Sequence, residues 1–424
     1  MSNKPGCKTT DIGDIPEEWE VVRLENVLKF TKNGLTYRQT KQGKYPVTRI
    51  ETISEGVIDT SKLGYLDNLS DKEIKECKLE VGDILFSHIN SIEHIAKAAI
   101  YLGKPEFLIH GMNLLLLRPN KEFVDPIFLL FYLKYEETRN RFRSWAKKAV
   151  NQASINQSEL SAFLIPLPPF VEQQKIASIL SSVDEDIQKT DEIIQKAQEL
   201  KKGLMQQLLT KGIGHTKFKQ TEIGEIPEEW EVVRLGDVCT SGTGGTPSRK
   251  KPEYFQGEIP WVKSTEIDFG VISHTEESIS SKALKESSAK LYPKGALLVA
   301  LYGQGVTRGK CALLGIDAAI NQACGAFQSK GKIQLHFAFF WLQANYRRIR
   351  VLSQGSNQAN LNLGLVRSIK LPLPPLTEQE KIISILSAID ERIEKERQRK
   401  EELEKLKKGL MQDLLTGRVR VKVN

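Results

Sequence analysis

Several features that would assign this sequence to a common class are missing from it. No apolar run reaches the ~18 residues that a membrane-spanning helix needs, and the N-terminal residues MSNKPGCKTTDIGD lack the apolar core of a signal peptide. The five cysteines among 424 residues are scattered and include no CxxC pair for zinc, which fits a reducing compartment. The six histidines include no HExxH motif. We expect a cytoplasmic, globular protein without a metal site.

Catalytic motifs are also missing. LPPF at 167–170 resembles the tetrapeptide of adenine-N6 methyltransferases, but Leu167 stands where an Asp or Asn must accept a hydrogen bond from the target amine. GVTRGKC at 305–311 is one residue short of a phosphate-binding loop and ends in a cysteine instead of a hydroxyl. SGTGGTP at 241–247 lacks the helix pattern that would follow such a loop. We predict no catalytic, cofactor-binding or metal-binding residue, so a self-sufficient nuclease or methyltransferase is disfavoured.

What the chain does contain is a duplication, because three blocks of sequence recur almost unchanged. The first block stands near the start of each half, and the other two recur 206 residues apart. The paired blocks are TDIGDIPEEWEVVRL (10–24) with TEIGEIPEEWEVVRL (221–235), PLPPFVEQQKIASIL (from Pro166) with PLPPLTEQEKIISIL (from Pro372), and KKGLMQQLLTKG (from Lys201) with KKGLMQDLLTG (from Lys407). Two near-identical frames therefore hold two unlike inserts, roughly 20–165 and 231–371, and a pseudo-two-fold molecule is expected.

Long helices are predicted after each PLPP motif, where apolar residues follow a spacing of four and three. Val171–Leu209 would measure ~58 Å at ~1.5 Å per residue. The simplest way to bury each stripe is to pack it against the stripe of the other half, with the two helices antiparallel as a coiled-coil spacer. The alternative is that each stripe packs on its own globular domain. The predicted stripe comprises Ile176, Leu180, Val183, Ile187, Ile194, Leu204, Leu208, Ile382, Leu386, Ile389, Ile393, Leu403, Leu410 and Leu414.

The inserts contain short strand-like segments separated by turns. KYPVTRIETI and LEVGDILFSHI in the first insert have counterparts in EIPWVKSTEI and YPKGALLVALYG in the second. Each insert then carries an aromatic helix candidate, FLLFYL at 128–133 and FAFFWL at 337–342. This mixture predicts an α+β fold for each insert.

Positive charge is concentrated on the parts that differ between the halves. The first insert carries +3, the second +8 and the tail 418–424 +3, out of a net charge of +8, so the repeated blocks are slightly acidic. This distribution is expected if the inserts face a polyanion such as DNA and the frame faces protein.

The repeated blocks give the chain a resemblance to a known family. The IPEEWEVVRL openings, the PLPP-x₂-EQ-x-KI helix starts, the KKGLMQ-x-LLT helix ends and NQA at 151–153 and 357–359 resemble the specificity (S) subunit of type I restriction–modification systems. The resemblance implies target recognition domains at 1–165 and 213–371, conserved spacer helices at 166–212 and 372–417, and a basic tail at 418–424. Each recognition domain would read half of a bipartite, asymmetric site in double-stranded DNA.

The same resemblance implies the partners and their cofactors. The spacer helices would set the gap between half-sites and dock two modification (methyltransferase) subunits, which carry S-adenosylmethionine. Two restriction subunits that use ATP and Mg would complete the complex. The chain itself would be a non-catalytic subunit that binds no cofactor.

Candidate DNA contacts lie in loops that follow the predicted strands, because Arg, Lys, Asn and Gln read base edges and Lys, Arg and hydroxyls hold phosphates. In the first insert they are Lys32, Tyr37, Arg38, Lys41, Lys44, Arg49, His88, Asn90, His94 and Lys97. In the second they are Thr246, Ser248, Arg249, Lys250, Lys251, Lys263, Tyr302, Gln304, Thr307, Arg308 and Lys310. The alternative for any single lysine is a solvated basic surface.

Two interpretations of the function therefore remain open. One is sequence-specific DNA binding, and the other is a coiled-coil scaffold whose two β-rich inserts bind proteins. The basic inserts on an acidic frame favour DNA. Trp19 and Trp230 recur in both halves and cannot specify two different sequences, so we assign them to the core.

Overall fold

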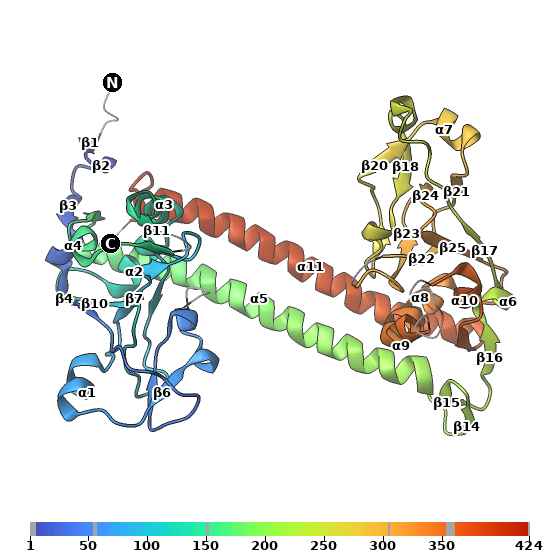
Figure 1. The fold of residues 1–424 in the computed structure, drawn as a ribbon, viewed down its shortest axis with the longest axis horizontal. Coiled ribbons are helices and arrows are strands. Elements are labelled where there is room, and N and C mark those ends of the chain that lie inside the picture. The colour runs from blue at the N-terminus through green and yellow to red at the C-terminus, as the bar shows by residue number, and fades with distance from the viewer. Residues whose placement is uncertain (1–5, 54–56, 150–151, 304–305, 353–360, 423–424) are drawn as a thin grey trace. The chain divides into compact units, whose positions relative to one another are not determined.

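The computed structural model describes residues 6–53, 57–149, 152–303, 306–352 and 361–422. The chain divides into two units, Met1–Asp191 with Arg399–Asn424 and Glu192–Gln398. Each unit contains one insert, the first half of one long helix and the second half of the other (Figure 1). Within the described residues, no helix combines the length and the apolar composition needed to cross a membrane.

The first unit is an α+β domain. Its strands are β1 (Cys7–Thr10), β2 (Gly13–Pro16), β3 (Glu20–Arg23), β4 (Leu28–Asn33), β5 (Tyr45–Val47), β6 (Gly64–Leu66), β7 (Ile84–Phe86), β8 (Ile89–Asn90), β9 (Ala98–Ile100), β10 (Leu115–Pro119), β11 (Lys147–Ala149), β12 (Gln152–Ser154) and β13 (Leu164–Leu167). Its shorter helices are α1 (Asp71–Cys77), α2 (Pro126–Lys134), α3 (Glu136–Trp145) and α4 (Gln157–Ser161), with 3₁₀ turns η1 (Leu24–Val27), η2 (Ile50–Ile53) and η3 (Thr60–Lys62). The central sheet has the order β4-β10-β7-β9, and a second sheet has the order β11-β12-β8.

The second unit is also an α+β domain. Its strands are β14 (Phe218–Thr221), β15 (Gly224–Pro227), β16 (Glu231–Arg234), β17 (Cys239–Thr243), β18 (Ile259–Val262), β19 (Val271–Ile272), β20 (Glu277–Ile279), β21 (Lys290–Tyr292), β22 (Leu297–Ala300), β23 (Cys311–Leu314), β24 (Ala318–Ile320), β25 (Cys324–Ser329) and β26 (Lys370–Leu373). Its shorter helices are α6 (Leu235–Val238), α7 (Ser281–Glu286), α8 (Leu335–Ala344), α9 (Tyr346–Val351) and α10 (Leu363–Arg367), with η4 (Pro252–Phe255) and η5 (Ser264–Glu266). Two sheets have the orders β17-β25-β22-β23-β19 and β20-β18-β24-β21. The α+β class predicted for both inserts is confirmed.

Each unit has its own hydrophobic core. In the first unit Trp19 is fully buried among residues such as Phe128 and Leu180, and in the second Trp230 is fully buried with Phe337 and Leu386. The aromatic segments predicted as helices form α2 and α8, and all six residues of each are buried.

The repeated motifs meet in the same way in both units. The strand from the IPEEWEVVRL block pairs antiparallel with the strand that ends in the first Pro-Leu of the PLPP motif, as β3 with β13 and β16 with β26. The Trp19 indole N–H donates to the Glu172 carboxylate at 3.0 Å, and that of Trp230 donates to Glu378 at 2.9 Å. The repeated Trp and Glu therefore tie the opening block to the start of the long helix.

The glutamine of the EQ pair fastens the insert to the same helix. The side-chain oxygen of Gln173 accepts from the backbone N–H of Asp125 at 2.8 Å, and that of Gln379 accepts from Gln334 at 2.7 Å. Both donors lie just before the aromatic helices α2 and α8, so one motif positions both inserts on the frame.

The C-terminal tail completes the first unit. Arg420 donates from Nε to Glu172 at 2.7 Å and from Nη2 to Glu18 at 2.7 Å. In the second unit, His215 in the linker after the long helix lies 2.9 Å from Glu378. Both acidic partners of Arg420 belong to the repeated blocks, so its positive charge is neutralised within the frame.

Two long helices carry the predicted apolar stripe. They are α5 (Phe170–Lys211, 42 residues) and α11 (Leu376–Leu415, 40 residues), ~63 and ~60 Å long. Each begins directly after a PLPP motif, because proline excludes a helical hydrogen bond there. Every residue of the predicted stripe is buried or half-buried.

Ion pairs give the direction and register of the helix pair. Asp184 pairs with Lys407, and Asp191 with Lys400 at 2.7 Å, in the first unit; Lys201 pairs with Asp390 at 2.6 Å in the second. In the second unit the backbone N–H of Ile213, just after α5, also donates to Glu378 on α11. Ascending numbers along α5 meet descending numbers on α11, so the helices are antiparallel in each unit. The first and third pairs are equivalent in the repeat, since their residues are 206 apart.

Candidate nucleic-acid interface

The second insert gathers cationic candidates at the β20 edge of its four-stranded sheet. Arg249 donates from both Nη atoms to the two carboxylate oxygens of Glu277, at 2.6 and 3.1 Å. Its guanidinium lies 4.0 Å from the ring centre of Phe255 and 5.4 Å from that of Trp261. Lys263 also donates to Glu277, at 3.2 Å. These cations lower the pKa of Glu277, Arg249 contributing the largest effect.

The other candidates of this loop are also exposed. Lys251 donates to the Tyr254 hydroxyl at 2.7 Å and lies 3.5 Å from Glu286. Thr246 donates to the side chain of Gln322. Ser248 and Lys250 are exposed, so both remain on the surface of the insert.

The loop after β22 brings together fewer of the predicted contacts. Tyr302 is exposed, while Thr307 and Arg308 are half-buried. Lys310 pairs with Asp268 at 2.6 Å, whereas Arg308 forms no ion pair within the part of the chain that the structure describes. Gln304 lies outside the described residues.

In the first insert, the basic stretch is partly neutralised by α1. Lys32 pairs with Glu76 at 2.6 Å, and the Tyr37 hydroxyl donates to Glu73. Arg49 lies 3.5 Å from Glu51, and Lys44 lies 4.9 Å from the ring centre of Tyr45. The remaining candidates, Arg38 and Lys41, are exposed.

Of the candidate residues in the loop after β7, some lie at the surface and one lies in the interior. Asn90, His94 and Lys97 line a shallow hollow of about 170 Å³. His88, in contrast, is only 8% exposed, and burial lowers its pKa to about 4. In this conformation His88 belongs to the interior of the domain, so the hollow presents Asn90, His94 and Lys97.

Sequence reasoning missed the acidic and aromatic partners of the candidates. Glu73, Glu76, Asp268, Glu276 and Glu277 each bond a residue that was selected for its basic or polar character. Counting charge along an insert cannot reveal such pairs, because strand pairing and loop packing bring the partners together. The net positive charge is therefore less available than the count of cations implies.

A second buried histidine makes the stability of the first unit dependent on pH. His110 is fully buried, its Nε2 lies 2.9 Å from the Leu114 carbonyl oxygen, and burial lowers its pKa to about 4. The unfolded chain binds a proton with an ordinary pKa of ~6.5, so the stabilisation present above that pH is lost as pH falls toward 4. We expect the loss to reach about 2 kcal/mol by pH 5.

Urea unfolding of wild type and His110→Gln at pH 7.5 and pH 5 measures this contribution. The variant should lose less stability between the two pH values than wild type does. His94→Gln is the matched control, because it removes an exposed histidine of the same domain. Equal slopes for His110→Gln and wild type would contradict the assignment.

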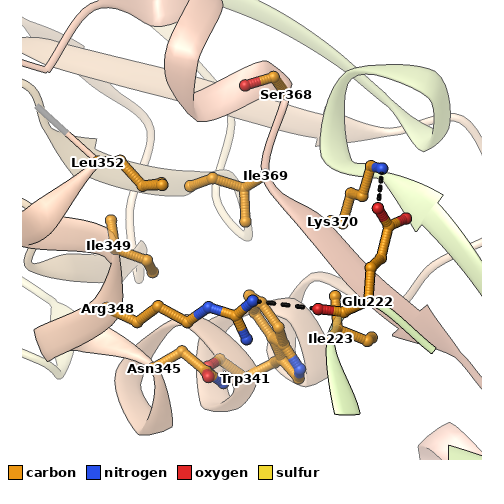
Figure 2. Close-up of a pocket in the computed structure, with 10 residues that line it drawn as sticks. All are labelled: Glu222, Ile223, Trp341, Asn345, Arg348, Ile349, Leu352, Ser368, Ile369 and Lys370. Carbon is orange, nitrogen blue, oxygen red and sulfur yellow. Dashed lines mark hydrogen bonds and ion pairs between the residues drawn. The ribbon is translucent and has the colours of Figure 1, made fainter. Parts of the chain in front are cut away.

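A larger hollow of about 260 Å³ lies on the frame side of the second unit (Figure 2). Its apolar lining includes Ile223, Trp341 and Ile369, and its charged side chains bond within the hollow. Figure 2 shows Lys370 paired with Glu222, whose backbone oxygen accepts from Arg348 at 3.4 Å. The arrangement stabilises the β14–β15 hairpin against α9.

Fold and sequence together define a duplicated protein of two α+β units, in which near-identical frames carry unlike, basic inserts. The sequence model described as the type I restriction modification DNA specificity domain matches residues 16–199 and again 227–405. The chain belongs to this family.

Individual relatives agree with that assignment. The chain is 43% identical to the type I restriction enzyme MjaX specificity subunit of Methanocaldococcus jannaschii, over 98% of this chain and 97% of that protein. It is 22% identical to the StySPI specificity subunit of Salmonella potsdam, over 88% of this chain and 82% of that protein. The crystal structure of the type I restriction–modification S subunit from M. genitalium has the same fold, with a TM-score of 0.63, 15% identity and coverage of 99% of this chain and 100% of that one. The predicted family and the role as the DNA specificity component are confirmed.

Proposed function

We propose that each insert reads one half of a bipartite, asymmetric DNA sequence. The observation that carries this proposal is that near-identical frames hold unlike inserts. If both units read the same bases, the inserts would need to be as similar as the frames. The basic loops and the acidic frame support DNA as the ligand of the inserts.

Further parts of the proposal concern spacing and assembly. The helices α5 and α11 set the gap between half-sites and dock two modification subunits, which bind S-adenosylmethionine. Two restriction subunits, using ATP and Mg, join that complex in the cytoplasm. No residue of this chain is assigned to a cofactor, so the chain contributes sequence selection to chemistry performed by its partners.

Among the predicted contacts, we propose that exposed side chains meet DNA first, among them Arg38, Lys41, His94, Ser248, Arg249, Lys250 and Tyr302. Lys32, Lys251, Lys263 and Lys310 must first share or leave an acidic partner. Phosphate competes for such cations, and binding through them weakens steeply with salt.

Exchange of the inserts tests the proposal. Residues 20–165 are replaced by the corresponding insert of a relative, the chain is expressed with its modification subunits, and methylated genomic positions are mapped. We expect one half of the methylated sequence to change and the other half to persist. Exchange of residues 231–371 is the matched control and should change only the other half.

Methylated positions that stay the same after both exchanges would contradict the proposal. The inserts would then bind proteins, and the scaffold interpretation would replace DNA reading. A gel shift of the wild-type complex on genomic fragments distinguishes these two cases directly.

A further inference from the structure

Arg249 in the second insert is an exposed arginine whose guanidinium is held by both a carboxylate and an aromatic ring. Its side chain is 55% exposed, yet its guanidinium stacks on Phe255 and bonds Glu277 through both Nη atoms. An exposed arginine normally loses side-chain entropy on binding. Here that loss has already occurred before any ligand arrives.

The sheet fixes both the carboxylate and the aromatic surface. Glu277 lies directly opposite Trp261 in the antiparallel pair β18–β20. The Trp261 indole donates to the backbone oxygen of Gly245 at 3.1 Å, and Phe255 meets its ring edge-to-face at 5.8 Å. Lys263 bonds the same carboxylate, so Glu277 has two cationic neighbours and little freedom to turn away.

The donors that remain on Arg249 have a defined geometry. A guanidinium has five N–H groups, and Glu277 takes one from each Nη atom. Three N–H groups remain, and two of them, Nε–H and the neighbouring Nη–H, are parallel donors on a different edge from the one that bonds the carboxylate. Within the described residues, the hydrogen bonds of Arg249 are the two to Glu277.

Two parallel donors fit guanine better than any other base. In the major groove guanine presents two acceptors, O6 and N7, whereas adenine presents one acceptor and one donor. Lysine cannot substitute, because it offers a point charge without a planar pair of donors.

We propose that Arg249 reads a guanine in the half-site bound by the second insert, and that Glu277 is the residue that positions it. The proposal rests on the proposed function, because it assumes that this insert meets DNA. It adds a base identity, a reading residue and a positioning residue that the family assignment does not supply.

The carboxylate is essential to this arrangement. Glu277→Gln keeps the shape of the side chain but replaces one acceptor oxygen by an NH₂ group, which opposes a guanidinium donor. The orientation of Arg249 is then lost while its charge remains. We expect discrimination at one G·C pair to fall roughly 5- to 150-fold in Arg249→Ala, Arg249→Lys and Glu277→Gln.

The experiment uses the complex of the full chain with its modification subunits. Binding is measured on the mapped recognition sequence and on duplexes in which each specified base pair is replaced in turn. Lys250→Ala is the matched control, because Lys250 is the exposed neighbour of Arg249 and should weaken binding to all duplexes equally. Thermal melting confirms that each variant is folded, and Arg249→Lys and Glu277→Gln test the proposal should Arg249→Ala fail to fold.

The proposal is supported if the three variants relax the same single G·C pair and retain the other half-site. It is overturned if that half-site contains no G·C pair, if Glu277→Gln discriminates like wild type, or if Arg249→Ala weakens all duplexes equally, as a phosphate contact does. Failure of the proposed function gives a different result, because wild type would then select no bipartite sequence at all.

Discussion

Seven residues added at the centre of both long helices, after Glu192 in α5 and after Gln398 in α11, will widen the gap between the two half-sites. A heptad keeps the apolar stripe on the same face of each helix. Each insertion lies between the two ion pairs of the first unit and the ion pair of the second unit. All three pairs, Asp184–Lys407, Asp191–Lys400 and Lys201–Asp390, therefore keep their partners. The added rise is ~10 Å, or about three base pairs.

Both half-site sequences should remain unchanged, because neither insert is altered. Three base pairs also turn the duplex by about a third of a helical turn, so the longer gap should be accompanied by weaker binding. Mapping of methylated positions, with the modification subunits present, measures the gap directly. A heptad in α5 alone is the control: it shifts one helix against the other, and methylation should be lost. A folded, doubly extended chain that kept the wild-type gap would refute the spacer role.

The duplicated frame and the long helices could be predicted because their signals are local or repeated in the sequence. The apolar stripe from Ile176 to Leu208 recurs from Ile382 to Leu414, so period and repeat pointed to the same helices. The first long helix was predicted as Val171–Leu209 and spans Phe170–Lys211, so its ends were located to within two residues. The pairing of Trp19 with Glu172 could not be predicted, because 153 residues separate the two.

The strand bounds and the strand order of the inserts could be predicted less well from the sequence. The segment KYPVTRIETI was expected to be a strand, but only Tyr45–Val47 forms one, and Ile50–Ile53 turns into a 3₁₀ helix. Likewise, β10 lies between β4 and β7, an order that no local pattern encodes. Strand propensity reflects packing against neighbours, and those neighbours are distant in the sequence.

The candidate interface illustrates the same limit at single residues. Arg249 could be selected from its loop, but Glu277 could not, since only the register of β18 with β20 places it beside Trp261. His88 was selected for following a buried strand, and it continues into the interior instead. Residue type identified the chemistry, whereas the fold decided which side chains are presented.

Removal of a single tryptophan will destabilise one unit and leave the other intact. Trp19 and Trp230 are each fully buried in the separate cores of the two units. Truncation of a buried Trp to Ala costs about 3–5 kcal/mol, through lost apolar contact and the cavity left behind. The indole N–H is lost too, so Glu172 or Glu378 gives up one of its donors.

Hydrogen exchange followed by mass spectrometry separates the two variants, because amide protection reports the stability of each segment. Each 1.4 kcal/mol of lost stability speeds exchange about tenfold. In Trp19→Ala, peptides from 6–191 and 399–422 should therefore exchange at least a hundredfold faster, while peptides from 192–398 keep their protection. Trp230→Ala should give the reverse pattern, so each variant is the control for the other. Loss of protection in both units from either substitution would mean that the two cores unfold together, and the frame would then be one cooperative body instead of two repeated ones.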